Sequence, residues 1–233
     1  MDINELLKKI SLLNIEDTLK AIADEFTGQV VFTTSFGIED QVITDIICKN
    51  DIPISIVSID TGRLFSETYK VHHATLEKYK CKIKVYYPNN GSLQKLLTEK
   101  GPYSFYESVE NRKECCNIRK VEPLGRALKE MNCWITGIRA EQSPERTNMQ
   151  IIEEDKGYNI IKLNPIFDWT LDQVVSYLDK NNVPYNSLHH KGYISIGCEP
   201  CTRAIKPGED FRAGRWWWEN NSGKECGLHT HGK

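Results

Sequence analysis

Long apolar runs, a strong net charge and internal repeats are all missing from this sequence of 233 residues. No stretch approaches the roughly 20 apolar residues that a membrane-spanning helix needs. The formal net charge of −2 gives no electrostatic reason to expect a nucleic acid or a membrane surface as partner. The opening MDINELLKKISLL spaces its apolar residues as an amphipathic helix does and lacks the continuous apolar core of a signal peptide. We therefore expect a cytoplasmic protein.

Strand-like and helix-like segments alternate along the chain. Strands are expected in GQVVFTTS, IPISIVSID, CKIKVYY and CWITGIR, and helices near 2–13, 15–26, 39–49, 66–80 and 170–181. Ser66 is expected to cap one helix, and Thr170 with Gln173 has the spacing of a capping box in another. The alternation favours an α/β fold, a twisted and mostly parallel sheet flanked by helices.

The chain length suits one domain with a sizeable core. Within a single domain over 1–233 we expect N-terminal helices in 1–27 and a nucleotide-binding α/β core in 28–190. The last segment, 191–233, is rich in Gly, Trp, Arg and Cys and poor in strand signal. We interpret it as a functional segment laid over the core.

Three loops follow predicted strands and share one type of composition: TSFGIED, IDTGRLFSET and TGIRAEQSPER. Each combines glycine with hydroxyl or charged side chains, which suits an anion or a nucleotide held on backbone N–H groups at a helix start. Ligands of open parallel sheets bind at the carboxyl ends of the strands, near a switch point in strand order. Any one loop is explained by ordinary turn chemistry, but the three together predict a ligand site.

Eight cysteines are present, at positions 48, 81, 115, 116, 133, 198, 201 and 226. In a reducing compartment such a set indicates metal binding or catalysis before disulfides. Cys48, Cys81 and Cys133 lie in apolar or strand-like contexts, so we interpret these three as packing residues.

Four of the remaining cysteines form two pairs, adjacent Cys115 and Cys116 and the C-x-x-C pair Cys198 and Cys201. Four thiolates complete either a zinc tetrahedron or an iron–sulfur cubane. Neighbouring helical residues point about 100° apart and converge poorly on one ion, which favours a cluster over zinc. A strained disulfide between neighbours and a thioredoxin-like use of Cys198 and Cys201 stay open as alternatives.

Basic residues surround both pairs, at Arg112, Lys113, Arg119, Lys120, Arg203, Lys206, Arg212 and Arg215. Eight cations exceed what bound thiolates need, and planar guanidinium groups suit phosphate or sulfate. We therefore predict an anion pocket beside the cysteines.

The last cysteine, Cys226, lies in the tail KECGLHTHGK between basic and histidine residues. A thiol beside cations is partly ionised near neutrality and is therefore nucleophilic. The glycines on both sides predict a tail that can move between a substrate and an outside partner.

Seven stretches together resemble a known family: SFGIED, IDTGRLFSETY, KECCNIRKVEPL, TGIRAEQS, NSLHHKGYISIGCEPCTR, EDFRAGRWWWE and KECGLH. In this order, from about residue 30 to the end, they resemble the assimilatory adenylyl-sulfate reductases, the iron–sulfur branch of the PAPS/APS reductases. A cluster-free branch, the phosphoadenylyl-sulfate (PAPS) reductases, shares the KECGLH tail and lacks both cysteine pairs. The sequence therefore resembles the branch that uses adenosine 5′-phosphosulfate (APS).

The resemblance implies one 4Fe–4S cluster on Cys115, Cys116, Cys198 and Cys201, with Cys226 as the nucleophile. It implies the adenine-nucleotide alpha hydrolase-like fold, in which TTSFGIED corresponds to the SGGxDS loop of ATP pyrophosphatases. Phe36 replaces a glycine of that loop, which argues against pyrophosphatase chemistry.

The resemblance also implies the residues around the substrate. Catalytic cations would be Lys120, Arg212 and Arg215, and substrate-binding residues would be Ser35, Phe36, Gly37, Asp60, Thr61, Gly62, Arg139 and Arg146. The usual RREQS reads RAEQS here, so Ala140 cannot supply the second arginine's contact.

The implied reaction is the reduction of APS to sulfite and AMP by thioredoxin or a similar dithiol protein. It would pass through a cysteine S-sulfonate and serve sulfate assimilation and cysteine biosynthesis. A dual APS/PAPS reductase and a zinc-stabilised nucleotide-binding module are the alternatives. The oligomeric state is not determined by the sequence, which is compatible with a homo-oligomer.

Overall fold

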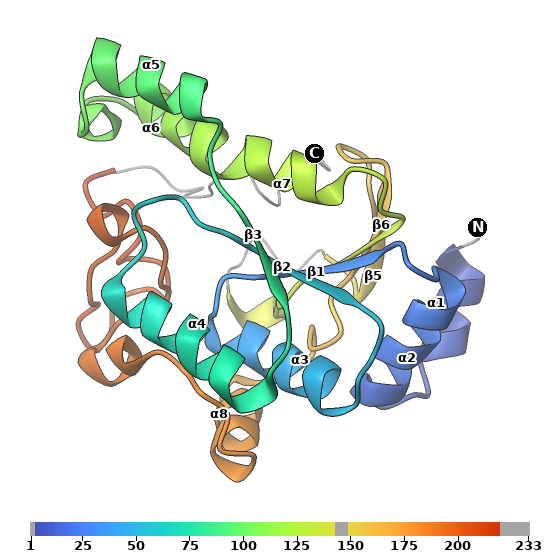
Figure 1. Ribbon diagram of the computed structural model, residues 1–233. Helices are drawn as coiled ribbons and strands as arrows, with labels where there is room; N and C mark the ends of the chain where they lie inside the picture. Colours follow the sequence, from blue (N-terminus) through green and yellow to red (C-terminus); the bar gives the residue numbers. More distant parts are fainter. Residues whose placement is uncertain (1–2, 143–148, 220–233) are drawn as a thin grey trace.

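The computed structural model describes residues 3–142 and 149–219 and contains a twisted six-stranded sheet with helices on both faces (Figure 1). The strand order is β3-β2-β1-β4-β6-β5. All neighbours are parallel except β5 and β6, which are antiparallel. The strands are β1 Val30–Thr34, β2 Ser55–Ile59, β3 Ile83–Tyr86, β4 Cys133–Ile135, β5 Ile152–Asp155 and β6 Ile160–Leu163.

The order of the strands reverses direction next to β1. The chain builds β2 and β3 on one side of β1 and returns to its other side with β4. Such a switch point lies between β1 and β4, and ligands of open α/β sheets bind there at the carboxyl ends of the strands.

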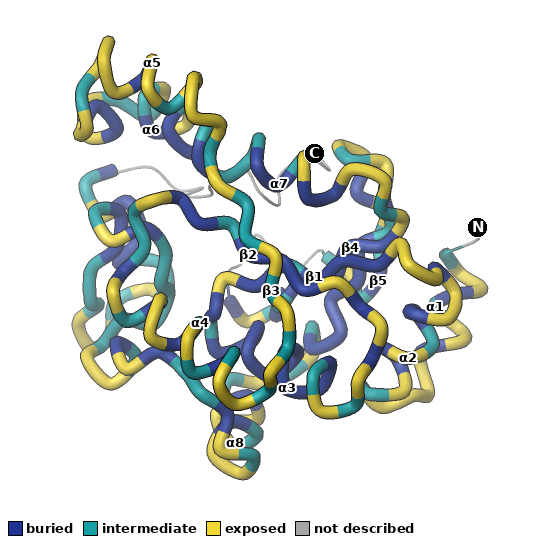
Figure 2. Tube along the Cα trace, viewed as in Figure 1, coloured by how far each residue is buried: buried dark blue, intermediate teal, exposed yellow. Residues whose placement is uncertain are grey.

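Helices cover both faces of the sheet and protect its strands from water. The larger apolar cluster joins α1 Ile3–Ile10, α2 Ile15–Glu25, α3 Ile38–Lys49 and α8 Leu171–Lys180 to one face. α7 Glu122–Leu128 covers the other face through Leu124 and Leu128, which pack near Trp134. α3 is buried over most of its length, as the central helix of its layer (Figure 2). Among the described residues, no helix combines the length and apolarity needed to cross a bilayer.

Two helices from the middle of the chain project from the sheet, α5 Asn90–Lys100 and, beside it, α6 Val109–Cys116 (Figure 1). α4 Ser66–Tyr79 precedes β3 and lies next to α3 (Figure 1). A π-helical turn, η2 Asn117–Val121, continues α6 directly into α7. The adjacent cysteines therefore end an α-helical segment where the backbone changes its pitch.

The predicted α/β fold with a mostly parallel sheet is confirmed. The four predicted strands are β1 to β4, and the five predicted helices are α1 to α4 and α8, with shifted ends. The capping box is present: Thr170 Oγ1 accepts from Gln173 N at 3.2 Å, and Gln173 Oε1 accepts from Thr170 N at 2.8 Å.

The cap predicted at Ser66 is wrong, because Phe65 occupies the N-cap position and Ser66 is the first helical residue. Phe65 is buried and packs edge-on against Tyr193 at 5.6 Å. Packing of this aromatic anchor, rather than a hydroxyl cap, determines where α4 begins.

The strands β5 and β6 were absent from the sequence prediction. They form an antiparallel pair, and β6 contains Lys162, which is 2% exposed and 3.4 Å from Glu153. Its ammonium lies over the ring of Trp134, 5.2 Å from the centroid. A buried charge with partners in other strands breaks the apolar pattern that sequence reasoning relies on.

Candidate active site

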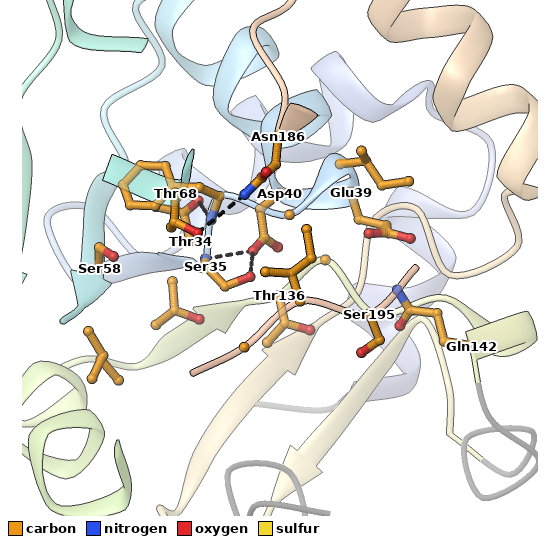
Figure 3. Close-up of a pocket in the computed structure, with 18 of the residues that line it drawn as sticks. Thr34, Ser35, Glu39, Asp40, Ser58, Thr68, Thr136, Gln142, Asn186 and Ser195 are labelled. Atoms are coloured by element: carbon orange, nitrogen blue, oxygen red, sulfur yellow. Dashed lines mark hydrogen bonds between the residues drawn. The ribbon is translucent and has the colours of Figure 1, made fainter. Parts of the chain in front are cut away.

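A cavity of about 240 Å³ opens at the carboxyl ends of β1, β2 and β4. Its walls include the hydroxyl residues Thr34, Ser58 and Thr136, one from each of these strand ends (Figure 3). The cavity therefore lies at the switch point, where the three glycine-containing loops were predicted to form a ligand site. Its volume lies somewhat below the roughly 300–1,000 Å³ of typical small-molecule sites.

The turn from β1 into α3 forms one wall of this cavity. Phe36 has a left-handed backbone, φ 60°, and its ring stacks on His72 with centroids 4.7 Å apart. A left-handed non-glycine residue costs roughly 1–2 kcal/mol, which burial and stacking of the ring offset here. Gly37 is the N-cap of α3 and makes no side-chain cap. The first N–H groups of α3 are thus available to an anion or a nucleotide in the cavity.

Asp40 holds that turn in place. Its carboxylate accepts from both the N–H and the hydroxyl of Ser35 at 2.7 Å (Figure 3). Burial raises the pKa of Asp40 to about 6, although the bonds from Ser35 oppose the shift. A Cβ at Gly137 would overlap the Asp40 carboxylate, so glycine lets the loop after β4 pack directly on the first turn of α3. The polar side of the cavity is therefore closely packed and preorganised.

The opposite end of the cavity is cationic. Lys120, Arg212 and Arg215 all line it, together with Ser195 and Gly197. A Cβ at Gly197 would overlap the Arg215 guanidinium, which therefore lies flat on the backbone of that glycine. These three cations, predicted from separate motifs, are brought together by the tertiary fold.

The ring of Trp216 packs against the arginines at the cationic end of the cavity. Its ring centroid lies 4.9 Å from Arg215 and 5.9 Å from Arg212. A third guanidinium, Arg112, lies 4.7 Å from the same ring and makes a bidentate ion pair with Glu219 at 2.9 and 3.0 Å. Cation–π contacts on a desolvated ring are worth roughly 2 kcal/mol each. Trp216 thus fixes the positions of guanidinium groups that would otherwise repel one another.

A second, smaller cavity lies behind the cationic end, with Lys120 and Cys198 in both walls. It contains both predicted cysteine pairs, one from α6 and one from the 3₁₀ turn η6 Glu199–Cys201 and its N-cap. All four thiols are buried and pack with Leu96, Phe105 and Trp216. Cysteines from distant parts of the sequence, Cys115, Cys116, Cys198 and Cys201, therefore share one cavity.

The electrostatic environment differs between the thiols. Burial alone would raise the pKa of Cys198, but Lys120, the Thr61 hydroxyl at 3.2 Å and Arg215 together lower it below the ordinary thiol value. Burial raises the pKa of Cys201 to about 12, with the neighbouring Cys198 adding to the effect. Cys198 is therefore the more acidic thiol of its pair and the one nearest the cationic end.

Several buried N–H groups around the cysteines have no acceptor among the described residues. They are Arg63 Nη1, Arg119 Nε and Trp216 Nε1, and all three side chains line the cysteine cavity. Buried donors without partners are costly and rare in native proteins. Among the residues that the structure describes, no group of three or more His, Cys, Asp or Glu side chains is arranged to hold a single metal ion. The cavity thus presents thiols and donors suited to an anionic group that has several acceptor atoms.

The structure brings seven of the predicted substrate and catalytic residues to the main cavity: Ser35, Phe36, Gly37, Thr61, Lys120, Arg212 and Arg215. Asp60 and Gly62 lie next to the cavity, on either side of Thr61. The Asp60 carboxylate accepts hydrogen bonds from Gly62 N at 2.8 Å and from the Tyr69 hydroxyl. They shape the loop after β2. Arg146 and Cys226 lie outside the described residues.

Arg139 is the predicted contact that the structure does not bring to the cavity. It is 1% exposed and makes ion pairs at 3.0 Å with both Glu39 and Glu141. It also donates to the carbonyl of Trp169 at 3.2 Å. Its direct contact with a substrate remains a prediction, and its observed contacts hold the loop after β4 against α3.

Sequence reasoning missed other residues of the main cavity, above all Asn186 and His189. Asn186 is buried and donates to the Thr68 hydroxyl at 3.2 Å (Figure 3). His189 Nε2 is buried without an acceptor or donor partner among the described residues. Both belong to NSLHH, a motif recognised in the sequence without roles for its side chains.

Solved structures with the same arrangement define the class of fold. The chain aligns with an FMN adenylyltransferase of Candida glabrata in complex with FAD and pyrophosphate, at 18% identity and a TM-score of 0.55, over 92% of this chain and 75% of that one. The protein has the fold of the adenine-nucleotide alpha hydrolase-like α/β class. It shares with that class the sheet whose strand ends hold the main cavity.

The family follows from closer matches. Residues 29–204 match the phosphoadenosine phosphosulfate reductase domain, and the chain belongs to that family. A PAPS reductase of Candida auris, solved as a phosphate complex, is 31% identical with a TM-score of 0.73, over 87% of this chain and 96% of that one. Two relatives are named adenosine 5′-phosphosulfate reductase. That of Sinorhizobium fredii NGR234 is 49% identical over 90% of this chain and 84% of its own length, and that of Burkholderia cepacia is 48% identical over 97% and 89%.

Proposed function

We propose that this protein is a cytoplasmic adenylyl-sulfate reductase that reduces APS to sulfite and AMP with a dithiol protein of the thioredoxin type. The observation that carries the proposal is the shared wall between the two cavities. The main cavity is lined by three cations, and one of them, Lys120, also lines the cavity of the four cysteines. Relatives 46–49% identical that are named APS reductases support the same substrate.

The donor set of the cysteine cavity suits a 4Fe–4S cluster. Cys115, Cys116, Cys198 and Cys201 would hold it, and the unpartnered donors of Arg63, Arg119 and Trp216 line the same cavity and suit the acceptor sulfurs of such a group. When bound, the cluster would supply a fixed electrostatic and structural centre next to the anion site. Lys120 would couple the two sites by its charge.

The main cavity would bind APS with its anionic end toward Lys120, Arg212 and Arg215. Backbone N–H groups of the turn around Gly37 would contact the nucleotide. Positioning and charge stabilisation would then supply most of the rate enhancement. Asp40 and Gly137 keep this turn fixed before substrate arrives.

The chemistry would take place on the Cys226 thiolate, which lies outside the described residues. Its sulfur attacks the sulfuryl sulfur of APS, the bond to the bridging oxygen breaks, and AMP leaves with that electron pair. The Cys226 S-sulfonate is then attacked at the cysteine sulfur by a thiolate of the dithiol protein, which releases sulfite. The second thiol of the partner resolves the mixed disulfide and restores Cys226. The sum is APS and a dithiol converted into AMP, sulfite, a disulfide and two protons.

Anaerobically purified protein with APS and reduced thioredoxin should form sulfite and AMP in equal amounts. The visible spectrum should show the brown absorption of an iron–sulfur protein. A colourless protein with one zinc ion and no sulfite would support the nucleotide-binding module instead. PAPS in a parallel assay tests dual specificity, which requires a comparable kcat/KM for both nucleotides.

Replacement of Lys120 by methionine should lower kcat/KM by about 10²–10³-fold while the iron content stays near one cluster per chain. The expected loss equals that of one oxyanion donor, because Lys120 is one of the three cations at the anionic end. Steady-state kinetics with iron analysis measure both effects. The matched control is Lys113→Met. Lys113 is an exposed lysine of α6, about two helical turns before Lys120. Equal rates in the two variants would contradict the role of Lys120.

Replacement of Gly197 by alanine should weaken AMP binding by roughly 10–100-fold. The added methyl group overlaps the Arg215 guanidinium and must displace it, which removes charged hydrogen bonds worth about 1.5–3 kcal/mol. Calorimetric titration with AMP measures the change. The control is Gly125→Ala on α7, where the nearest atom, of Tyr158, lies 3.8 Å from the added Cβ. Unchanged AMP affinity in the Gly197 variant would show that Arg215 does not bind the nucleotide.

A further inference from the structure

The carboxyl end of α3 contains a second cluster of reactive side chains, remote from the cavities. α3 begins at the main cavity and runs for 12 residues, so its last turn lies roughly 15 Å away. There the buried Asp45 accepts from the hydroxyls of Tyr79 at 2.5 Å and Tyr177 at 2.7 Å. Lys78 Nζ lies 3.8 Å from the same carboxylate. These contacts tie α3, α4 and α8 together (Figure 1).

Two cysteines lie next to these contacts of Asp45. Cys48 lies on α3 one turn after Asp45, and Cys81 follows α4 two residues after Tyr79. The contact between Asp45 and Tyr79 therefore places the two cysteines near each other, and Cys81 is among the groups that act on the Cys48 thiol. Both thiols are free and each residue is only partly buried. The two cysteines thus lie near each other and near the surface.

The two thiols differ in environment. Burial, the contact with Cys81 and the carboxylates of Asp45 and Asp51 raise the pKa of Cys48, which stays protonated. Cys81 lies between α4 and β3 beside the exposed Lys80 and Lys82, whereas Cys48 packs against the main apolar core. Among the described residues, no third His, Cys, Asp or Glu completes a metal site with them. The arrangement suits a nucleophilic thiol with a resolving partner.

We propose that Cys48 and Cys81 form a reversible disulfide by exchange with a low-molecular-weight disulfide such as oxidised glutathione. The Cys81 thiolate attacks one glutathione sulfur, and the other glutathione leaves as a thiolate. Cys48 loses its proton to water and attacks the Cys81 sulfur, which releases the second glutathione. One oxidised glutathione is thereby reduced to two glutathiones while the two cysteines are oxidised, and a dithiol reverses the exchange.

The disulfide would link α3 to the start of β3. The helices α3 and α4 both begin at the main cavity. Gly37, the N-cap of α3, and Thr68, in the first turn of α4, line it. The link would therefore lock the layer that carries the nucleotide turn. A crosslink that closes a loop of this length raises the midpoint of thermal unfolding by several degrees, about 5–10 °C for a chain of this size.

Peptide mapping of the complete protein tests the proposal. Anaerobic protein is treated with oxidised glutathione, free thiols are alkylated, and the product is cleaved after glutamate and analysed without reduction. Fragments 40–67 and 78–99 contain Cys48 and Cys81 as their only cysteines. We expect the two fragments to be joined and to separate after treatment with dithiothreitol. Separate alkylated fragments, or links to other cysteines, would overturn the proposal.

Two variants test the order of the steps. Cys48→Ser should accumulate glutathione on fragment 78–99, because no resolving thiol remains. Cys81→Ser should leave fragment 40–67 unmodified, and the reverse pattern would overturn the assignment of Cys81 as the attacking thiol. The rise in thermal midpoint after oxidation should disappear in both variants. Reduced samples of both should keep the wild-type rate of sulfite release, so failure of the disulfide is distinguishable from failure of the proposed reductase function.

Discussion

Protein with Cys115 replaced by alanine is expected to lose iron and sulfite production together, with activity at least about 100-fold below wild type. Cys115 lines the cysteine cavity and is 8% exposed, so no solvent ligand can readily take its place. The proposed cluster would also contribute folding free energy, since it would hold α6 and the turn at η6 together. Iron analysis, the visible spectrum and the sulfite assay on one anaerobic preparation measure all three effects.

The matched control for this experiment is Cys133→Ala. Cys133 is completely buried in β4 and belongs to the main apolar core rather than to the cysteine cavity. This variant should be less stable, by about 1 kcal/mol for a small cavity, and should retain its iron. Full activity of Cys115→Ala in an iron-free sample would show that the cluster is not needed.

The change Cys226→Ser is expected to abolish turnover, by about 10⁴-fold or more, and to leave the brown colour intact. A serine hydroxyl remains protonated near neutral pH, so it cannot replace the thiolate as nucleophile. The other sulfurs near the substrate line the cysteine cavity as proposed cluster ligands. The sulfite assay together with the absorption spectrum separates loss of the nucleophile from loss of the cluster.

A single-turnover measurement sharpens this second test. Wild-type protein mixed with APS and no dithiol should gain one sulfonate per chain, located on Cys226 by mass spectrometry, and release AMP in the same amount. The Cys226→Ser protein should gain none. Sulfite release by the serine variant, or a sulfonate on another cysteine of the wild type, would overturn the assignment.

The two experiments probe cavities that the structure links physically. Lys120 and Cys198 are in both walls, and Trp216 packs with the four cysteines and also contacts Arg212 and Arg215. A change in the cysteine cavity can therefore move the arginines without touching them. We expect the loss of iron in Cys115→Ala to weaken AMP binding as well, whereas Cys226→Ser should bind AMP as wild type does.

Residues with similar sequence contexts acquired different positions in the fold. Arg139, Arg212 and Arg215 all belong to motifs rich in glycine and charge, yet only the last two line the main cavity. The guanidinium group of Arg139 instead makes ion pairs with the carboxylates of Glu39 and Glu141. The interpretation of the three remaining cysteines as packing residues fits Cys133, which is fully buried, and Cys48, which packs against the same core; Cys81 is only partly buried.

Local pattern was sufficient for the elements whose signal lies within a few residues. β-branched runs predicted β1 to β4, and helical spacing predicted α3 and α8, because burial of one face depends on neighbours in sequence. Residue type and motif likewise singled out the four clustered cysteines and the cations near them. Only the tertiary structure decided the strand order with its switch point, the β5–β6 pair, the meeting of both cysteine pairs behind Lys120, and the placement of Cys48 near Cys81. These depend on which distant segments pack together, and such contacts between remote residues leave no periodic trace in the chain.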